Sequence, residues 1–303
     1  MVVRAGESRF RGEPAISLQS GELTASFLPA VGMTGVSLRV GDREHLALPG
    51  GVDHLRAGGT GGLPLLAPWA NRLASRRYRI GGTSVDLTGL ALGTDDNGLP
   101  IHGLLVGAAG WRVDGYDVRG ANARLRASID VDAPAFPFPH RIEVLVTARD
   151  RELDVRTTVI PTGRRRVPIA FGWHPYLRLP STPRRQWLLR MPRRRHLELD
   201  RFGIPTGAAT VEAAEADAVG RRTFDDLYAF ERVRRLAFET DDAAIELWCD
   251  SAYPYGQVWV PSGKSFAALE PMAAPTNALG DGTAPLVEPG DSYAARFVLS
   301  VGA

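Results

Sequence analysis

The sequence predicts an all-β protein, built as one large antiparallel β-sandwich. Short runs in which apolar and polar residues alternate recur along most of the chain, and glycine and proline separate them. Alternation with a period of two is typical of half-buried antiparallel strands. No segment stands out with the 3.6-residue period of a helix. Many short strands separated by turn residues favour a sandwich, and residues 1–303 are expected to form a single domain.

The N-terminal third begins with strands and continues through two unusual loops. Residues 50–62 are rich in glycine but have neither the lysine nor the following helix of a phosphate-binding loop, so we expect a flexible surface loop. Residues 63–72, LPLLAPWANR, contain two prolines and a tryptophan, which argues against a helix or a central strand. We expect an ordered loop there, crossing the edge of a pocket. The expected strands are residues 15–18, 23–28, 35–40 and 76–80.

The rest of the chain is expected to be strands with two interruptions. Residues 133–140, APAFPFPH, predict a proline-rich connection, and His140 is given a structural or exposed place at the start of a strand. Residues 180–223 look irregular, and we expect a long excursion from a sheet. The expected strands are residues 124–129, 141–147, 153–160, 236–238, 244–248, 255–260, 266–271 and 293–301.

Composition argues against several classes of function. The chain has 36 Lys and Arg against 34 Asp and Glu, and its arginine clusters at 164–166, 184–185 and 193–195 are short and interrupted by acidic residues. No nucleic-acid motif accompanies them, so we expect no nucleic-acid partner. The single cysteine, Cys249, excludes an internal disulfide and zinc sites built on paired cysteines. No apolar run of about 18 residues and no signal-peptide pattern occur, which predicts a cytoplasmic protein without membrane contact.

The most distinctive stretch is residues 171–179, FGWHPYLRL. Pro175 cannot donate to a strand ladder and restricts His174 to extended geometry. His174 should therefore sit at a strand end or bulge. Trp173 and Tyr176 offer flat surfaces suited to sugar rings. The alternative is a buried histidine that only caps a strand.

Further candidates lie at other loop and strand ends. Arg72 could reach ligand hydroxyls through its planar fork of donors, or pair with a nearby carboxylate. His102 stands between Pro100 and Gly103, where the backbone must bend. Gln257 lies on an expected strand.

Carboxylates complete the set of candidates. Asp225 and Asp226 point in opposite directions if their segment is extended, so at most one faces a given pocket. Glu270 ends an apolar strand, where glutamate is rare and seldom buried unpaired. It is either exposed by a bulge or kept for a purpose.

The chain resembles the aldose 1-epimerase (mutarotase) family. The resemblance rests on motifs that occur in the family's order over most of the chain. They are FLPAVGMTGVSL, PLLAPWANRLASRRYRIGG, NGLPIHGL, FGWHPYLRL, FDDLY, GQVWV and ALEPMAAPTNAL. The histidine of HPY, together with the later E-P and N-A, is a fairly specific pair, whereas each other motif alone is weak.

The resemblance implies a galactose-mutarotase-like β-supersandwich with a sugar-binding cleft and no cofactor or metal. It implies interconversion of α and β anomers of a hexose, with Glu270 as general base, His174 as general acid and His102 at the ring oxygen. Arg72, Asp225 and Gln257 would bind hydroxyl groups. Two departures weaken the match. The family usually has L-D-x-x-F where this chain has FDDLY, so Asp226 remains possible, and Leu104 replaces a frequent glycine.

Four other readings stay open. The chain could be a hexose-6-phosphate mutarotase, with an arginine cluster gripping the phosphate. It could be a glycosidase that uses Asp225 and Glu270 as its carboxylate pair. It could be a metal enzyme, although no close pair of ligands appears. It could also be a carbohydrate-binding module without catalysis. The sequence does not indicate an oligomeric state.

Overall fold

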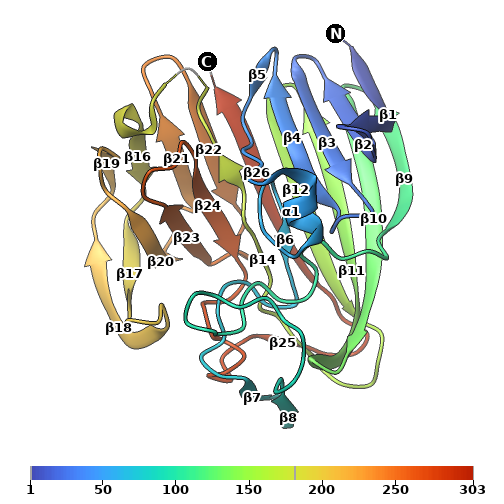
Figure 1. Ribbon diagram of the computed structural model, residues 1–303, viewed down its shortest axis with the longest axis vertical. Coiled ribbons are helices and arrows are strands. Elements are labelled where there is room, and N and C mark those ends of the chain that lie inside the picture. Colours follow the sequence, from blue (N-terminus) through green and yellow to red (C-terminus); the bar gives the residue numbers. More distant parts are fainter. Residues whose placement is uncertain (1, 181, 303) are drawn as a thin grey trace.

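The computed structural model describes residues 2–180 and 182–302, and these residues fold almost entirely into antiparallel strands. The N-terminal sheet has five strands in chain order (Figure 1). These are β1 (Val3–Phe10), β2 (Glu13–Ser20), β3 (Leu23–Leu28), β4 (Thr34–Val40) and β5 (Arg43–Glu44). The structure therefore confirms the predicted all-β class.

Two larger sheets form the rest of the sandwich. The nine-stranded sheet has the order β19 (Glu215–Ala218), β16 (Leu188–Met191), β21 (Arg235–Glu239), β22 (Ala244–Cys249), β26 (Tyr293–Gly302), β12 (Glu152–Pro161), β11 (Phe136–Arg149), β10 (Asn122–Ala133) and β9 (Arg112–Arg119). The eight-stranded sheet includes β18 (Pro205–Glu212), β17 (Arg194–Leu199), β20 (Phe224–Phe230), β23 (Tyr255–Val260), β24 (Ala267–Met272), β14 (Gly172–Trp173) and β6 (Leu65–Leu66), in that order, with β15 (Tyr176–Leu177) also paired to β24.

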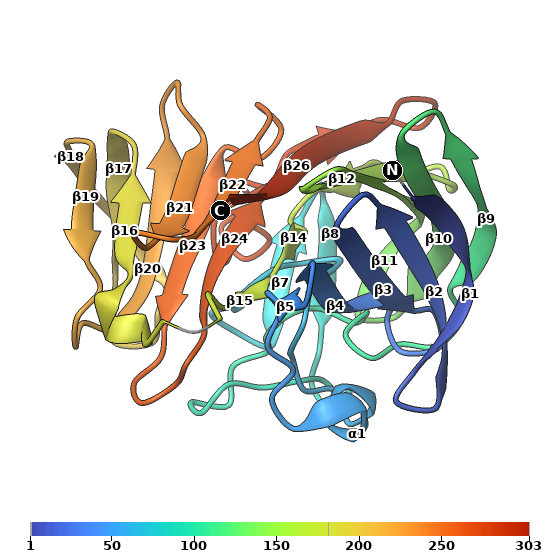
Figure 2. The ribbon, with the colours of Figure 1, turned by 90° about the horizontal axis from the view of Figure 1, so that it is seen from above.

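The remaining elements are short. They are α1 (Gly51–Arg56), a 3-10 turn (Arg184–Gln186), and the strand pairs β7 (Arg77–Ile80) with β8 (Thr83–Asp86) and β13 (Val167–Pro168) with β25 (Leu286–Val287). Seen from above, β20, β23 and β24 lie opposite β21 and β22, while the N-terminal sheet covers the β9–β11 end (Figure 2).

Alternating side chains explain how the sheets meet. Along β12 the even pattern of buried and less buried residues turns one face to the core. Trp173 on β14 packs its ring 5.8 Å from that of Phe297 on β26 and donates a 3.0 Å hydrogen bond from Nε1 to Thr157 Oγ1 on β12. A large aromatic ring whose polar atom is satisfied thus joins the two sheets where the candidate site begins.

Three expectations about the chain were wrong. Residues 180–223 are not an irregular excursion, since β16 to β19 extend both large sheets. Residues 133–140 contain a tight turn at Pro134, and Pro137 and Pro139 lie in β11 between Phe136 and His140, where the register with β10 shifts. Residues 50–62 contain helix α1, and Thr60 shares a 2.5 Å hydrogen bond with the Tyr176 hydroxyl. That loop is part of the site's surroundings. His140 is structural, as expected: it is buried, with Nδ1 2.7 Å from the Phe138 carbonyl oxygen.

Candidate active site

Glu270 lies on β24, one of the central strands of the eight-stranded sheet, and is only 2% exposed. Gln257 on β23 is its direct cross-strand partner, and Gln257 in turn pairs with Leu227 on β20. Residues that are direct partners share a face of the sheet, and so do residues two apart on one strand. Glu270, Gln257 and Asp225 therefore form a row across three adjacent strands.

His174 reaches this row from the bend between β14 and β15, the strand-end position that Pro175 predicts. Its backbone N–H donates to the Pro64 carbonyl (3.1 Å), and its Nε2 lies 3.4 Å from Glu270 Oε1. The imidazole stacks on Tyr176 with a centroid distance of 4.5 Å and meets the edge of Trp259 at 5.3 Å. Of the two aromatic residues predicted to suit a sugar ring, Tyr176 instead stacks on this imidazole, and Trp173 is buried between the sheets.

The enclosure of the pair controls its protonation. Burial raises the pKa of Glu270 well above its ordinary value, and the charge of Asp225 adds to the effect. Burial lowers the pKa of His174 well below its ordinary value, with His102 contributing. Both shifts favour the uncharged forms, a neutral carboxyl group on Glu270 and a neutral imidazole on His174.

His102 stands beside His174, with ring centroids 5.6 Å apart and the planes at 77°. Its φ of 64° is in the left-handed region, which costs a non-glycine residue roughly 1–3 kcal/mol. The next residue, Gly103, has no alternative: a Cβ there would lie 2.2 Å from the Ala67 carbonyl oxygen. The bend predicted from the sequence is thus present, and burial lowers the pKa of His102 to about 3.

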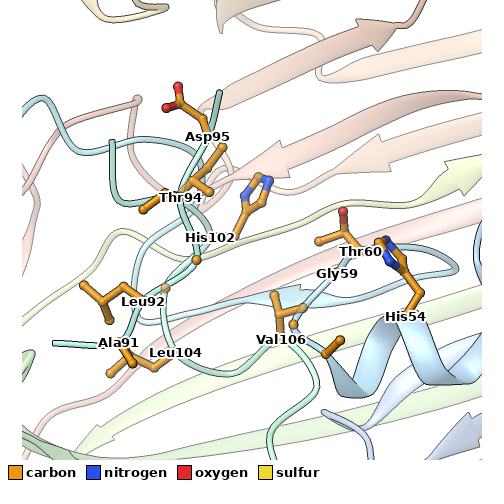
Figure 3. A pocket seen from close by; sticks show the side chains of 15 residues that line it. His54, Gly59, Thr60, Ala91, Leu92, Thr94, Asp95, His102, Leu104 and Val106 are labelled. Carbon is orange, nitrogen blue, oxygen red and sulfur yellow. The ribbon is translucent and has the colours of Figure 1, made fainter. Parts of the chain in front are cut away.

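A cavity of about 650 Å³ opens beside His102 (Figure 3). In Figure 3, Asp95 and Thr94 lie on one side of His102, and Thr60 and His54 lie on the other. Leu104, which occupies the position of a frequent family glycine, belongs to the apolar part of this wall with Leu92 and Val106.

Arg72 is held by two carboxylates. Its Nε donates to Asp95 Oδ2 (2.9 Å), and its Nη2 donates to Asp225 Oδ2 (3.2 Å). Gln257 Nε2 donates to the other oxygen of Asp225 (2.7 Å). The structure thus brings Arg72, Asp225 and Gln257 together. It confirms that Arg72 is an ion-pair partner, and Arg72 also lines a cavity.

Asp95 is the residue that the sequence reasoning missed. Its Oδ1 accepts the backbone N–H groups of Asn97 and Leu99, both at 2.9 Å, which builds a turn around the carboxylate. The segment Asp-Asp-Asn-Gly signals such a turn. Nothing in the sequence indicates that the other oxygen binds an arginine 23 residues earlier.

Asp225 and Asp226 point to opposite faces of β20, as an extended backbone requires. Asp226 Oδ1 lies 3.4 Å from His196 Nε2, and the other ring nitrogen of His196 is 2.9 Å from Glu212. Burial raises the pKa of Asp226, although His196 opposes the shift. Because Asp225 alone contacts Arg72 and Gln257, it is the aspartate that shares their face.

A second cavity, of about 520 Å³, adjoins Arg72 and Asp225. Its other walls come mainly from β17 and the turn that joins β17 to β18. Among residues 2–180 and 182–302, no three His, Cys, Asp or Glu side chains form a group that could hold a metal ion. No helix in the same part of the chain is long and apolar enough to cross a membrane.

Comparison with known proteins decides the family. The family model for aldose 1-epimerase matches residues 14–300. The chain belongs to the aldose 1-epimerase family. Members of this family are isomerases, so the chain is assigned as a mutarotase-type enzyme, which agrees with the motifs in its sequence. No curated protein matches the sequence.

Solved structures support the fold of the family. A galactose mutarotase-like protein from Clostridium acetobutylicum has a TM-score of 0.88 at 17% identity, with 99% of this chain and 98% of that one covered. A galactose 1-epimerase from Lactobacillus acidophilus has a TM-score of 0.78 at 12% identity, covering 99% of both chains. An aldose epimerase homologue from C. elegans has a TM-score of 0.76 at 17% identity and the same coverage. At these identities the likeness concerns the fold.

Proposed function

We propose that the protein interconverts the α and β anomers of a free aldohexose by opening and reclosing the pyranose ring. The observation that carries the proposal is the enclosed pair of Glu270 and His174, whose Oε1 and Nε2 atoms are 3.4 Å apart. A carboxylate and an imidazole at this separation can reach two oxygens on the same carbon. The anomeric carbon is such a centre, since it bears both the hydroxyl O1 and the ring oxygen O5.

In the proposed mechanism Glu270 accepts the proton of the anomeric hydroxyl while His174 donates a proton to O5. The C1–O5 bond breaks, and its electron pair stays on O5, which becomes a hydroxyl as C1 becomes an aldehyde. Rotation about C1–C2 turns the aldehyde over, and the reverse transfers close the ring on the other face. Each positioned acid or base contributes about 10²–10⁴-fold to such a reaction.

One proton shared between Glu270 and His174 is enough for this mechanism. Burial favours a neutral carboxyl group on Glu270 and a neutral imidazole on His174. Moving the proton from Glu270 to His174 produces the carboxylate and imidazolium that the mechanism needs without taking a proton from water. Sugar hydroxyls, which donate to the carboxylate, favour that charged form when substrate binds. His102, with a pKa near 3, is neutral at physiological pH and can exchange a hydrogen bond with a sugar oxygen.

Arg72, Asp225 and Gln257 are proposed to bind the hydroxyl groups of the ring. Asp225 accepts from both neighbours, so the three side chains are oriented before a sugar arrives. Asp95 holds the other side of the guanidinium and is proposed to position Arg72.

A free sugar is preferred to a 6-phosphate because of where the charges lie. Arg184 donates to the Pro261 carbonyl, Arg166 pairs with Glu288, and no arginine of the three sequence clusters is among the residues lining the two described cavities beside the site. The walls of these two cavities carry two arginines, Arg72 and Arg201, and five carboxylates, Asp95, Glu198, Asp200, Asp225 and Asp226. A dianionic phosphate is held by arginine forks or helix N-termini, and it would be repelled here.

Polarimetry on freshly dissolved α-glucose and α-galactose tests the proposal. Acceleration of anomer exchange is expected with at least one free aldohexose. A tight sugar complex without acceleration for any aldose or aldose phosphate would replace it by the binding-module reading. Cleavage of aryl glycosides would replace it by the glycosidase reading.

A further inference from the structure

We propose that Tyr176 and Thr60 act together as positioning residues for the general acid, with Thr60 holding the phenol ring that orients the His174 imidazole. The inference rests on the proposed function, because it takes His174 as the group that donates a proton to the ring oxygen. Neither Tyr176 nor Thr60 takes part in the proton transfers themselves.

The His174 imidazole has few polar contacts that could fix its orientation. Its Nδ1 is buried and has no hydrogen-bond partner in the part of the chain that the structure describes. Its Nε2 lies 3.4 Å from Glu270 Oε1, and this contact must change when the two groups exchange protons with a sugar. A catalytic imidazole is commonly oriented by a hydrogen bond at its second nitrogen. The orientation of His174 must therefore come from packing.

Tyr176 covers one face of this imidazole. The two rings are stacked, with centroids 4.5 Å apart and an angle of 17° between their planes. Trp259 and His102 meet the imidazole at steep angles of 81° and 77°. Rotation of the imidazole about its Cβ–Cγ bond would drive it into the stacked phenol ring, because side chains in a protein interior are closely packed. The plane of the Tyr176 ring thus sets the direction in which Nε2 of His174 points.

The Tyr176 ring is held at both ends. On the backbone side, the N–H of Tyr176 donates to the Gly62 carbonyl (2.8 Å), and its own carbonyl accepts from the N–H of Ala47 (2.8 Å). At the far end of the ring, the hydroxyl shares a 2.5 Å hydrogen bond with Thr60 Oγ1. Burial raises the pKa of Tyr176 to about 12, so the hydroxyl keeps its proton and can make this bond at neutral pH.

Thr60 is supplied by a glycine-rich segment that packs against the N-terminal sheet. Residues 58–62 are otherwise all glycine, so Thr60 has the one side chain of this segment that can bind a hydroxyl. Gly62 has a φ of 68°, and a Cβ there would lie 2.2 Å from the Gly35 carbonyl oxygen on β4. Figure 3 shows Thr60 in the wall of the 650 Å³ cavity beside His102. The segment therefore joins the wall of this cavity to the ring that packs on His174.

Matched variants test the hydrogen bond between Thr60 and Tyr176. Anomer exchange of the free aldohexose that the wild type turns over fastest is followed by polarimetry. Thr60→Val and Tyr176→Phe should each lower kcat about fivefold, the scale of one hydrogen bond, with little change in KM. Because both remove the same bond, the double variant should be no slower than the slower single variant. Thr60→Ser should retain the wild-type kcat. So should Tyr78→Phe, which loses a buried 2.8 Å bond to the Ala135 carbonyl away from the site.

The NMR signals of the His174 ring report its orientation without any catalysis. The C–H protons of an imidazole stacked on a phenol ring are shifted by the ring current, and the signals are assigned by their loss in His174→Asn. In Thr60→Val the shift should become smaller or the signals should broaden, because the phenol ring is less well held. Tyr176→Leu should abolish the shift. Thr60→Ser should restore the wild-type signals.

The inference requires both the loss of kcat and the changed ring signals in Thr60→Val, and the absence of either overturns it. Losses that add in the double variant would show that Thr60 and Tyr176 act separately, which also refutes it. A raised KM with unchanged kcat in Thr60→Val would make Thr60 a sugar-binding residue instead. If the wild type exchanges no anomers, the proposed function fails, and changed ring signals in Thr60→Val would still assign Tyr176 and Thr60 to the orientation of His174.

Discussion

Replacing Glu270 by glutamine keeps the size of the side chain and removes the proposed base. Gln257 separates Glu270 from Asp225, so the nearest other carboxylate of the row is two strands away, roughly 10 Å. No carboxylate of that row can take over the proton transfer without a large shift. General bases contribute about 10²–10⁴-fold, which corresponds to roughly 3–5 kcal/mol at 1.36 kcal/mol per factor of ten. We expect kcat to fall about 10³-fold, with a smaller change in the affinity for the sugar.

Folding stability distinguishes a lost base from a damaged structure. The folded wild type keeps a proton on Glu270 that the unfolded chain releases above the ordinary pKa of 4.5, so its stability falls as the pH rises through the raised folded pKa. Glutamine does not ionise, and Glu270→Gln should become more stable than the wild type by a margin that grows with pH. Glu143→Gln, on an exposed position of β11, is the matched control. It should change neither kcat nor the dependence of folding stability on pH. The reasoning is refuted if Glu270→Gln retains more than a tenth of the wild-type kcat.

Three further results are expected. Asp225→Asn should raise KM about tenfold or more because Arg72 loses one of its two carboxylates. Asp226→Asn, on the other face of β20, should leave KM nearly unchanged. Equal effects of the two substitutions on KM would contradict the assignment of Asp225 and Asp226 to opposite faces. Glucose should be turned over with a higher kcat/KM than glucose 6-phosphate at both low and high salt, and a phosphate preference that weakens with salt would show the opposite charge at the cleft. The pH–rate profile of kcat/KM should be a broad plateau around neutrality. Its acidic limb comes from protonation of His174, whose pKa is lowered, and its basic limb comes from ionisation of Glu270, whose pKa is raised. A narrow optimum between pH 4.5 and 6.5 would contradict these two pKa shifts.

Local chemistry made much of the fold predictable. Alternating residues predicted strands such as β3 and β23 at their observed bounds, because successive side chains of a half-buried strand point alternately to the core and to solvent. Pro175 and Gly103 predicted bends at the two histidines, since each restricts the backbone directly. The region 180–223 was misjudged because β18 and β19 lie near sheet edges, where little burial is required and the hydrophobic pattern is weak.

The site was predictable only in part because its residues come together through the sheet. The candidates were found as unusual residues at strand ends, and the structure places all six of them within one connected set of contacts around β20, β23 and β24. Asp95 lies in an ordinary-looking turn. Its place in the site depends on Arg72, which contacts this turn from a distant loop. No local pattern records such a contact.

The ion pairs of Arg72 also explain how a charged guanidinium can lie close to Glu270 and His174, whose burial favours their uncharged forms. An unpaired arginine close to Glu270 would lower the pKa of that carboxyl and draw its proton away. Asp95 and Asp225 offset most of this charge, and Asp225 itself helps to raise the pKa of Glu270. In the proposed mechanism, sugar hydroxyls would replace part of the contact between Arg72 and Asp225, and this would shift the balance toward a charged Glu270 carboxylate. Asp225 would then couple the binding of hydroxyls at one end of the ring to the protonation of the base at the other. We therefore expect Asp225→Asn to lower the apparent pKa of the basic limb as well as the affinity for the sugar.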